Sequence, residues 1–155
     1  MTGYANHTYF FVCGNAGAHT IGRAHCSSVI RRIYAFNSTH QTDPSLDPAF
    51  ADKLKASCPY GNPNNKTMTV PMDMTRYIMD NQYYHDIIEN RGLFTSDATL
   101  LTNPKPKNLV FEFSGFLEMR GWQKKFATAM VRMGAIQVLT GQEGQLRVKC
   151  DVVNK

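Results

Sequence analysis

The sequence has no long apolar run. No stretch of the 155 residues approaches the roughly 18 consecutive apolar residues that a membrane-spanning helix needs. The run YFFVC at residues 9–13 is too short for a signal peptide, and no basic region precedes it. We therefore expect a soluble, globular chain with no membrane span and no visible signal peptide.

Acidic residues are fewer than basic ones. The chain has 12 Asp and Glu against 17 Lys and Arg, a formal net charge of +5, which would suit nucleic acid, an anionic membrane or an acidic polysaccharide. The basic residues are scattered, however, and the tightest groups are only Arg31-Arg32 and Lys124-Lys125. Because no basic stripe is interleaved with aromatic residues, the pattern argues against a nucleic-acid partner.

The spacing CxxC is also absent, which excludes a zinc ribbon or a thioredoxin-type redox pair. The four cysteines are Cys13, Cys26, Cys58 and Cys150, and disulfides are the better expectation for them. Glycosylation sequons begin at Asn6, Asn37 and Asn65. Cysteines and sequons together favour a secretory history, because disulfides persist in oxidising compartments.

What the sequence does contain is helical periodicity. Apolar residues recur at helical spacing in Ile21–Phe36, at Val29, Ile33 and Phe36. After the loop DPSLDP, Asp47 and Pro48 form an N-cap and first-turn pair. The helix that begins there places Phe50, Leu54 and Cys58 on its core face.

Two later segments show the same period. The spacing predicts a helix over Met79–Asn90 that ends before Gly92, with a shared face at Tyr84, Ile87 and Ile88. It predicts a longer helix over Phe116–Met133, stopped by Gly134. The apolar stripe of that helix, in which we expect the methionines to fill the core, is Trp122, Phe126, Met130 and Met133.

The remaining segments are less regular. Residues 1–16 have neither a helical nor a strand period, so we treat them as an atypical N-terminal segment. The segment QLRVKCDVV near the C-terminus favours an extended conformation. We find no internal repeat and no second domain. The sequence therefore predicts a mainly α fold with long ordered loops, in which residues 17–155 form one domain.

The segment GAHTIGRAHC, at Gly17–Cys26, carries two histidines beside glycines. Taken alone, a histidine in such a setting is more often structural than a metal ligand. Together with DPSLDPAFADKLKASCP, VPMD, DNQYY, RGLFTSDATLLTNP, KFATAMVRMG and LTGQEGQLRVKC, however, the segment resembles the secreted plant haem peroxidases, class III, from Gly17 to Asn154. The resemblance implies the proximal half of the helical fold of those enzymes.

For His19 the resemblance implies the role of proximal ligand to the iron of haem b. Asp97, in FTSDATL, would accept the hydrogen bond of the other ring nitrogen. Read without the resemblance, Asp97 would simply cap the helix that starts near Ala98. His25 falls where family members carry a polar residue near a haem propionate, and a plain surface histidine is the alternative.

The resemblance also implies a calcium site and a disulfide. The calcium ligands would be Thr20, Asp73, Thr75, Ile78 (through its carbonyl) and Asp80, all hard oxygen donors. The segment is one residue shorter than the family pattern between Asp73 and Thr75, and Arg76 replaces a proline, so a plain helix N-terminus stays the alternative. Cys26 would pair with Cys58, whereas Cys13 and Cys150 either pair with each other or stay free.

The family's distal motif, R-x-x-F-H-D, does not occur in this sequence. His7, His40 and His85 lie in contexts that match no distal histidine. The resemblance implies a secreted peroxidase that oxidises phenolic donors with hydrogen peroxide, here as a truncated form with weak turnover. The alternatives are a non-enzymatic remnant that binds calcium or acidic cell-wall polysaccharide, and a chain that does not fold stably without its partner half.

Overall fold

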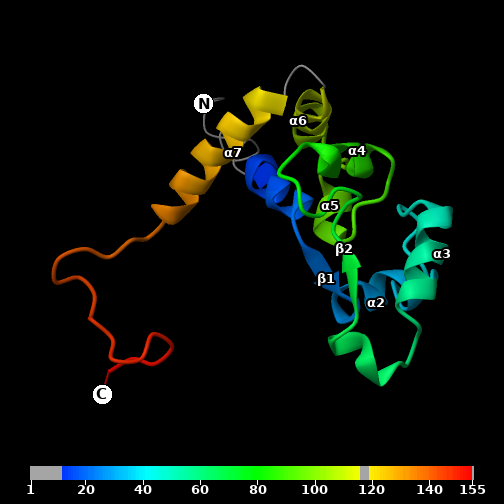
Figure 1. The fold of residues 1–155 in the computed structure, drawn as a ribbon, viewed down its shortest axis with the longest axis horizontal. Coiled ribbons are helices and arrows are strands. Elements are labelled where there is room, and N and C mark those ends of the chain that lie inside the picture. Colours follow the sequence, from blue (N-terminus) through cyan, green and yellow to red (C-terminus); the bar gives the residue numbers. More distant parts are fainter. Residues whose placement is uncertain (1–11, 116–118, 155) are drawn as a thin grey trace.

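The computed structural model describes residues 12–115 and 119–154. Helices dominate this part of the chain, and the two short strands pair with each other, which confirms the mainly α prediction (Figure 1). In chain order the elements are η1 (Gly17–Thr20), β1 (Arg23–His25), α2 (Cys26–Tyr34), α3 (Pro48–Ser57), η2 (Pro63–Lys66), β2 (Thr69–Pro71), α4 (Gln82–Ile88), α5 (Thr95–Thr99), α6 (Pro104–Ser114) and α7 (Met119–Gly134). No described helix is both long and apolar enough to cross a membrane.

The first predicted helix starts later than its periodicity suggests. Gly22 has a φ of 103°, a left-handed conformation that interrupts a helix. The next three residues form β1, which pairs antiparallel with β2 so that Ala24 lies opposite Val70. Only from Cys26 onward is the chain helical. The prediction over Ile21–Phe36 was therefore wrong for its first five residues, which precede α2, and for Ala35 and Phe36, which follow its end at Tyr34.

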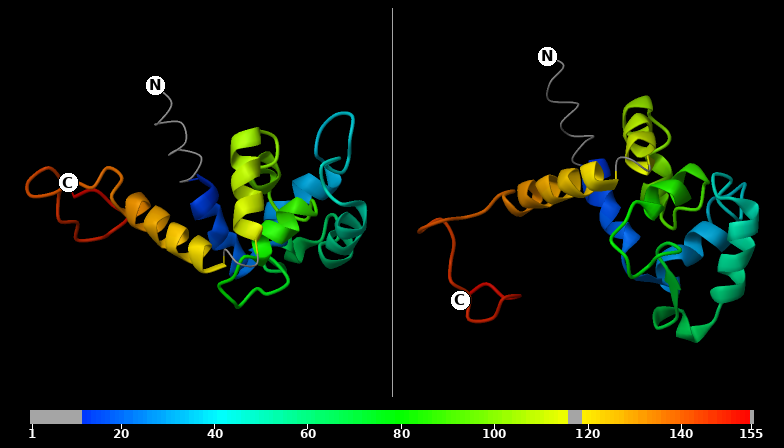
Figure 2. Two further views of the ribbon diagram at one scale, coloured as in Figure 1. Left: turned by 90° about the horizontal axis from the view of Figure 1, so that it is seen from above. Right: turned by 45° about the horizontal axis from the view of Figure 1, so that its top comes forward.

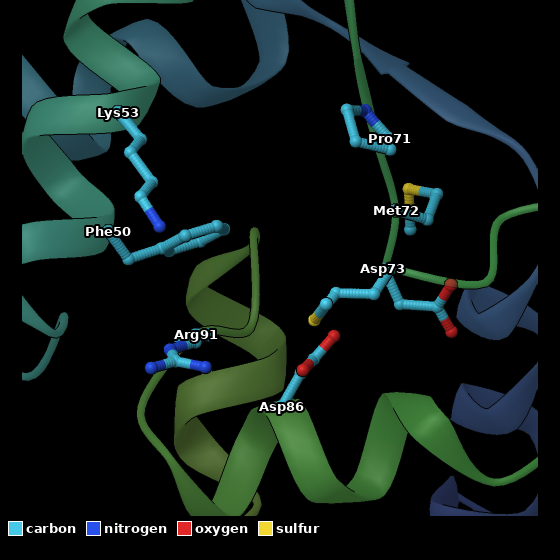
Figure 3. Close-up of a pocket in the computed structure, with 8 residues that line it drawn as sticks. Phe50, Lys53, Pro71, Met72, Asp73, Asp86 and Arg91 are labelled. Carbon is cyan, nitrogen blue, oxygen red and sulfur yellow. The ribbon is translucent and has the colours of Figure 1, made fainter.

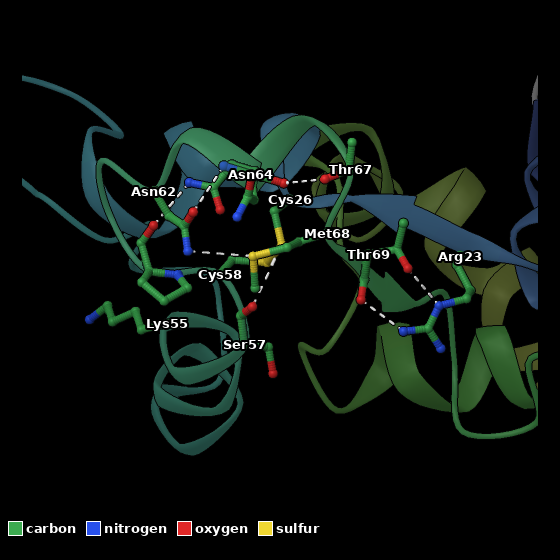
Figure 4. Close-up of a disulfide and its surroundings, with 12 residues drawn as sticks. Arg23, Cys26, Lys55, Ser57, Cys58, Asn62, Asn64, Thr67, Met68 and Thr69 are labelled. Atoms are coloured by element: carbon green, nitrogen blue, oxygen red, sulfur yellow. Dashed lines mark hydrogen bonds between the residues drawn. A yellow bond between two sulfur atoms is a disulfide. The ribbon is translucent and has the colours of Figure 1, made fainter.

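One hydrophobic cluster lies between α2 and α3. Val29 and Ile33 of α2 are buried against Leu54 of α3. The disulfide between Cys26 and Cys58, with a Cα–Cα distance of 5.4 Å, joins the start of α2 to the end of α3 (Figure 4). This is the pairing that the family resemblance implies, and it adds a covalent link between two helices that also pack against each other.

The N-terminus of α3 is capped as predicted. The Asp47 side chain accepts a hydrogen bond of 2.8 Å from the backbone amide of Phe50, and Pro48 lies in the first turn. Leu54 and Cys58 are buried, whereas Phe50 is only half-buried. The predicted face of this helix is therefore correct, although its first member lies at the edge of the core.

The buried Arg32 of α2 forms an ion pair with the loop before α3 and hydrogen bonds with the loop before α5. The Nε of Arg32 lies 2.6 Å from Asp43 Oδ2, and Nη1 donates to the carbonyl oxygens of Gly92 and Phe94. Burial alone would raise the pKa of Asp43, but hydrogen bonds from Arg32 and Ser45 outweigh it and hold the pKa below its usual range. The backbone that leads into α5 is therefore fixed from the side of α2.

A second hydrophobic cluster forms between α4, α6 and α7. It contains Tyr84 and Ile87 of α4, Phe113 of α6 and Trp122 of α7, all buried. The helix α4 is shorter than predicted, and it begins only at Gln82, whose backbone amide donates to the Asp80 side chain.

The cluster also includes part of the N-terminal segment. Residues 12–16 are helical, Cys13 is buried, and its carbonyl accepts a 2.8 Å hydrogen bond from the Tyr84 hydroxyl. Residues 1–11 of the predicted atypical segment lie outside the described residues. The sequence did not predict the helix at residues 12–16, because a helix of this length is too short to show a period.

The second half of α7 does not contribute to the core. Trp122 is buried, but Met130 and Met133 are 36% and 43% exposed. Figures 1 and 2 show α7 and the segment after it extending away from the remaining helices. The prediction that these methionines fill the core was wrong, since no described element covers that end of the stripe. The residues after α7 form turns and bends with no strand through Asn154, so the extended conformation predicted there was also wrong.

Candidate functional site

His19 lies in the short helix η1, and its ring contacts a carboxylate from a distant part of the chain. Its Nδ1 is 2.9 Å from Oδ1 of Asp97, which lies in α5. With a carboxylate as its acceptor, Nδ1 carries the ring proton, and the lone pair is left on Nε2. Nε2 makes no hydrogen bond within the described residues, and the side chain is 33% exposed.

Asp97 is buried and accepts three hydrogen bonds. In addition to His19, the Tyr83 hydroxyl donates to Oδ1 at 2.9 Å, and the backbone amide of Phe94 donates to Oδ2 at 2.8 Å. The last bond caps the N-terminus of α5. Asp97 therefore both accepts the bond from His19 and helps to cap a helix, although it caps α5 from its third residue, because α5 begins at Thr95 and not near Ala98 as predicted.

The backbone comes unusually close to Asp97 at Gly92. A Cβ built on Gly92 would lie 2.6 Å from the Cβ of Asp97, closer than side chains approach one another. Glycine is therefore required at this position by space.

Two aromatic rings fix the plane of the His19 ring. Tyr83 and Phe94 both meet it edge to face, with centroid distances of 5.6 and 5.1 Å. Burial raises the pKa of Tyr83 well above its usual range, and the neighbouring Asp97 raises it further. The hydroxyl therefore stays protonated and can only donate to the carboxylate.

Sequence reasoning missed Tyr83. The apolar face assigned to this helix contained Tyr84 and not Tyr83, whereas α4 in fact buries both tyrosines, one toward Asp97 and one toward Trp122. The signal was present in the pair of adjacent tyrosines, since a buried tyrosine hydroxyl needs a hydrogen-bond partner.

A second group of polar side chains begins at the residue after His19. The buried Thr20 hydroxyl lies 2.7 Å from Asp73 Oδ2 and 3.1 Å from Asp80 Oδ1. The Thr75 hydroxyl is 3.1 Å from the same Asp80 oxygen, and the Thr75 amide donates to Asp73. The structure thus brings four of the five predicted calcium ligands together despite the shortened segment. We call Thr20, Asp73, Thr75 and Asp80 the oxygen cluster.

Ile78 relates differently to the oxygen cluster. Its side chain is exposed, and its carbonyl oxygen accepts a 3.1 Å hydrogen bond from the amide of Asp80. A carbonyl oxygen has a second lone pair, so this bond leaves one for a cation.

The charge of the oxygen cluster is uncompensated within the described residues. Burial raises the pKa of Asp73, and the charge of Asp80 adds to that effect, although hydrogen bonds from Thr20 and Thr75 oppose it. The described residues contain no group of three or more His, Cys, Asp or Glu side chains placed around a metal position. Two carboxylates, two hydroxyls and a carbonyl nevertheless form a set of hard oxygen donors of the kind that Ca²⁺ takes.

The other predicted positions lie apart from His19. His25 is exposed on β1, the exposed His40 contacts Thr39 in a turn, and His85 is exposed on α4. His7 lies outside the described residues. Cys13 is a buried free thiol and Cys150 an exposed one, so they do not pair with each other.

Comparison with known proteins identifies the class of this arrangement. The sequence model described as "Peroxidase" matches residues 14–115, which include His19, Asp97 and the whole oxygen cluster. The chain belongs to the peroxidase family. Plant members of this family are haem proteins that also bind calcium.

The similar peroxidases are plant proteins. The chain is 49% identical over 142 residues to Peroxidase 5 of Vitis vinifera, 40% over 143 to Peroxidase 1 of Zea mays, and 39% over 140 to Peroxidase 56 of Arabidopsis thaliana. Each alignment covers 90% of this chain but 42%, 38% and 41% of the respective relative. The chain therefore spans about two fifths of the length of these peroxidases.

Proposed function

We propose that this chain forms the proximal side of a secreted haem peroxidase, with His19 as the axial ligand of haem b. The observation that carries the proposal is the hydrogen bond from His19 to the buried Asp97, which leaves Nε2 without a partner among the described residues, on a partly exposed side chain. When bound, the haem would supply the reaction with hydrogen peroxide and the oxidation of phenolic donors in one-electron steps.

The residues of this chain would hold and tune the ligand. Asp97 keeps the proton on Nδ1, so that Nε2 remains an unprotonated ligand nitrogen, and it makes the imidazole a stronger electron donor. Tyr83 and the amide of Phe94 restrain the carboxylate. Because Asp97 is held from two sides, the His19 ring cannot rotate away without losing its own hydrogen bond.

The oxygen cluster would hold a calcium ion. Its hydroxyl protons can rotate away, so that Thr20 and Thr75 turn lone pairs toward the ion and join Asp73, Asp80 and the Ile78 carbonyl. Bound positive charge would compensate the two neighbouring carboxylates. Since Thr20 follows His19 directly in the chain, the ion would also fix the backbone that carries the proximal ligand.

The distal chemistry would have to come from groups other than those described here. Proton transfer between the two peroxide oxygens, and stabilisation of the charge that develops, normally need a distal histidine and arginine. The 155 residues contain no R-x-x-F-H-D motif. We therefore expect the chain alone to oxidise a phenolic donor only weakly, at a rate close to that of free haem.

The alternative, a remnant that binds acidic polysaccharide, lacks a supporting feature. Two partly exposed lysines of the helices are already paired with carboxylates, Lys125 with Glu112 and Lys55 with Asp52. The Cys26–Cys58 disulfide supports an oxidising location such as the cell exterior.

Haem titration of the purified chain tests the proposal. We expect a Soret band that the variant His19→Ala loses and that His25→Ala, which removes an exposed histidine six residues away, retains. Steady-state turnover of a phenolic donor, compared with free haem at equal iron, should stay within about tenfold because both distal groups are missing. An unchanged Soret spectrum in His19→Ala would refute the assignment of the ligand.

A further inference from the structure

A cavity of about 210 Å³ lies between α3, β2 and α4 (Figure 3). Its apolar lining comes from Phe50, Pro71, Met72 and Met74, and its charged lining from Lys53, Asp73, Asp86 and Arg91. Drug-sized ligands occupy cavities of roughly 300–1,000 Å³, so this one fits a smaller molecule with a single ring. It shares only Asp73 with the oxygen cluster.

Asp86 supplies the cavity with a carboxylate oxygen that accepts no hydrogen bond from the described residues. The residue is only 6% exposed. Its Oδ1 accepts a 3.0 Å hydrogen bond from Gln82, whereas Oδ2 receives none from the described residues. Burial raises the pKa of Asp86, and the bond from Gln82 opposes this only in part. Oδ2 is not among the buried polar atoms that lack a partner, so it remains accessible to a ligand that donates a hydrogen bond.

The opposite side of the cavity is positively charged. Lys53 of α3 and Asp86 of α4 approach the cavity from opposite sides, and Arg91 lies near the ring of Phe50 (Figure 3). Arg91 already pairs with Glu89 and lies 3.9 Å from Asp47. Lys53, by contrast, forms no ion pair or hydrogen bond with any residue that the structure describes, which leaves its ammonium group available to an anion.

The carboxylate of Asp73 does not face the same part of the cavity as Asp86. Its two oxygens accept hydrogen bonds from Thr20 and Thr75, and in Figure 3 its carboxylate points away from Asp86. The cavity thus has a hydrogen-bond acceptor on one side, apolar walls of one ring and two thioethers, and a free cation on the other side.

We propose that this cavity binds a small aromatic carboxylate with a hydroxyl group at the far end of its ring. The ligand carboxylate would contact Lys53, the ring would lie against Phe50 and the thioether of Met72, and the hydroxyl would donate to Asp86 Oδ2. An aromatic amine of the same shape would also reach Asp86, but its net positive charge would face Lys53 and Arg91. Haem is not involved, so the proposal stands apart from the function proposed above.

Equilibrium binding of para-hydroxyphenylpropionate to the full chain tests this site. Phenylpropionate lacks the hydroxyl and para-ethylphenol lacks the carboxylate, so the two analogues probe Asp86 and Lys53 separately without any change to the protein. We expect each analogue to bind about tenfold more weakly, because a hydrogen bond or ion contact to a charged group contributes roughly 1.4 kcal/mol or more.

Variants of Lys53 and Asp86 test whether these side chains cause the differences in affinity. Lys53→Met should weaken the hydroxy acid about tenfold and leave para-ethylphenol unchanged, whereas Lys55→Met, on the same helix and paired with Asp52, should change neither. Asp86→Asn should weaken the hydroxy acid but not phenylpropionate. Equal affinity for all three probes, tighter binding of para-hydroxyphenylethylamine, or an equal loss in Lys55→Met would overturn the proposal.

Discussion

Asp97 shows how one residue can serve two purposes that sequence reasoning treats as alternatives. Oδ2 caps a helix, while Oδ1 receives both the imidazole of His19 and the hydroxyl of Tyr83. Because two donors share Oδ1, the strength of the bond to His19 depends on the bond from Tyr83. Tyr83 is therefore a positioning residue that acts through Asp97.

This sharing predicts the effect of Tyr83→Phe on the haem-loaded chain. Without the hydroxyl, Asp97 should attract the Nδ1 proton more strongly, so we expect a higher iron–histidine stretching frequency and a more negative reduction potential. Resonance Raman spectroscopy and potentiometry measure both. Tyr84→Phe is the matched control, since that hydroxyl contacts Cys13 and Trp122 rather than Asp97. Equal shifts in the two variants would contradict the prediction.

The contact between Gly92 and Asp97 predicts a second effect. Gly92→Ala should lower the free energy of unfolding by about 1–3 kcal/mol, because the added methyl group has no space. It should also weaken haem binding by displacing Asp97. Gly134→Ala is the control, because nothing lies within 4 Å of a Cβ at that position, and it should be neutral or slightly stabilising. Denaturant unfolding checks both variants, and equal stabilities would count against the crowding.

Helix α4 concentrates groups that resist ionisation. Burial raises the pKa of Tyr83 and of Tyr84 above their usual value, and burial of the adjacent Cys13 raises its pKa to about 11. Each group stays neutral in the folded chain at a pH where the unfolded chain already ionises it. The unfolded state therefore binds fewer protons, and stability decreases as pH rises.

The free energy of unfolding should accordingly fall as the pH rises from about 9, the usual value for a thiol, through about 11. Urea unfolding between these pH values measures the slope. Cys13→Ala should make the decrease shallower, whereas Cys150→Ala, which removes an exposed thiol, should leave it unchanged. A urea concentration at the unfolding midpoint that does not change with pH would show that burial does not hold these groups neutral.

At the scale of elements, the sequence predicted most clearly those features that depend on local chemistry. The cap at Asp47 and the apolar spacing of Val29 and Ile33 require only nearby residues, and the structure contains both. The strand at Arg23–His25 and the exposure of Met130 in α7 could not be predicted from nearby residues. Both depend on which distant element lies opposite, β2 in one case and no described element in the other.

The residues of the candidate site were predicted on a different basis. His19, Asp97 and the oxygen cluster were predicted from a family resemblance, not from spacing, because the residues lie far apart in the sequence. Tyr83 was missed for the complementary reason: its role appears only when α4 and α5 are seen together.

For the whole molecule, the distribution of buried residues divides the chain at α7. Nearly all buried side chains precede Met130, whereas the residues from Val131 to Asn154 are exposed, including Leu139, Leu146 and Val148. Exposed apolar surface of this extent marks a surface for interaction. The alignments place this chain on about two fifths of its relatives' length.

The separation of His19 and Asp97 has a consequence for synthesis on the ribosome. The two residues are 78 positions apart, and translation at 5–20 residues per second therefore exposes the histidine roughly 4 to 16 seconds before its carboxylate exists. During this interval the nascent chain can close the span from Cys26 to Cys58, but its imidazole has no fixed tautomer. In the role proposed for His19, stable haem binding would require α5 and would follow the synthesis of the first helices.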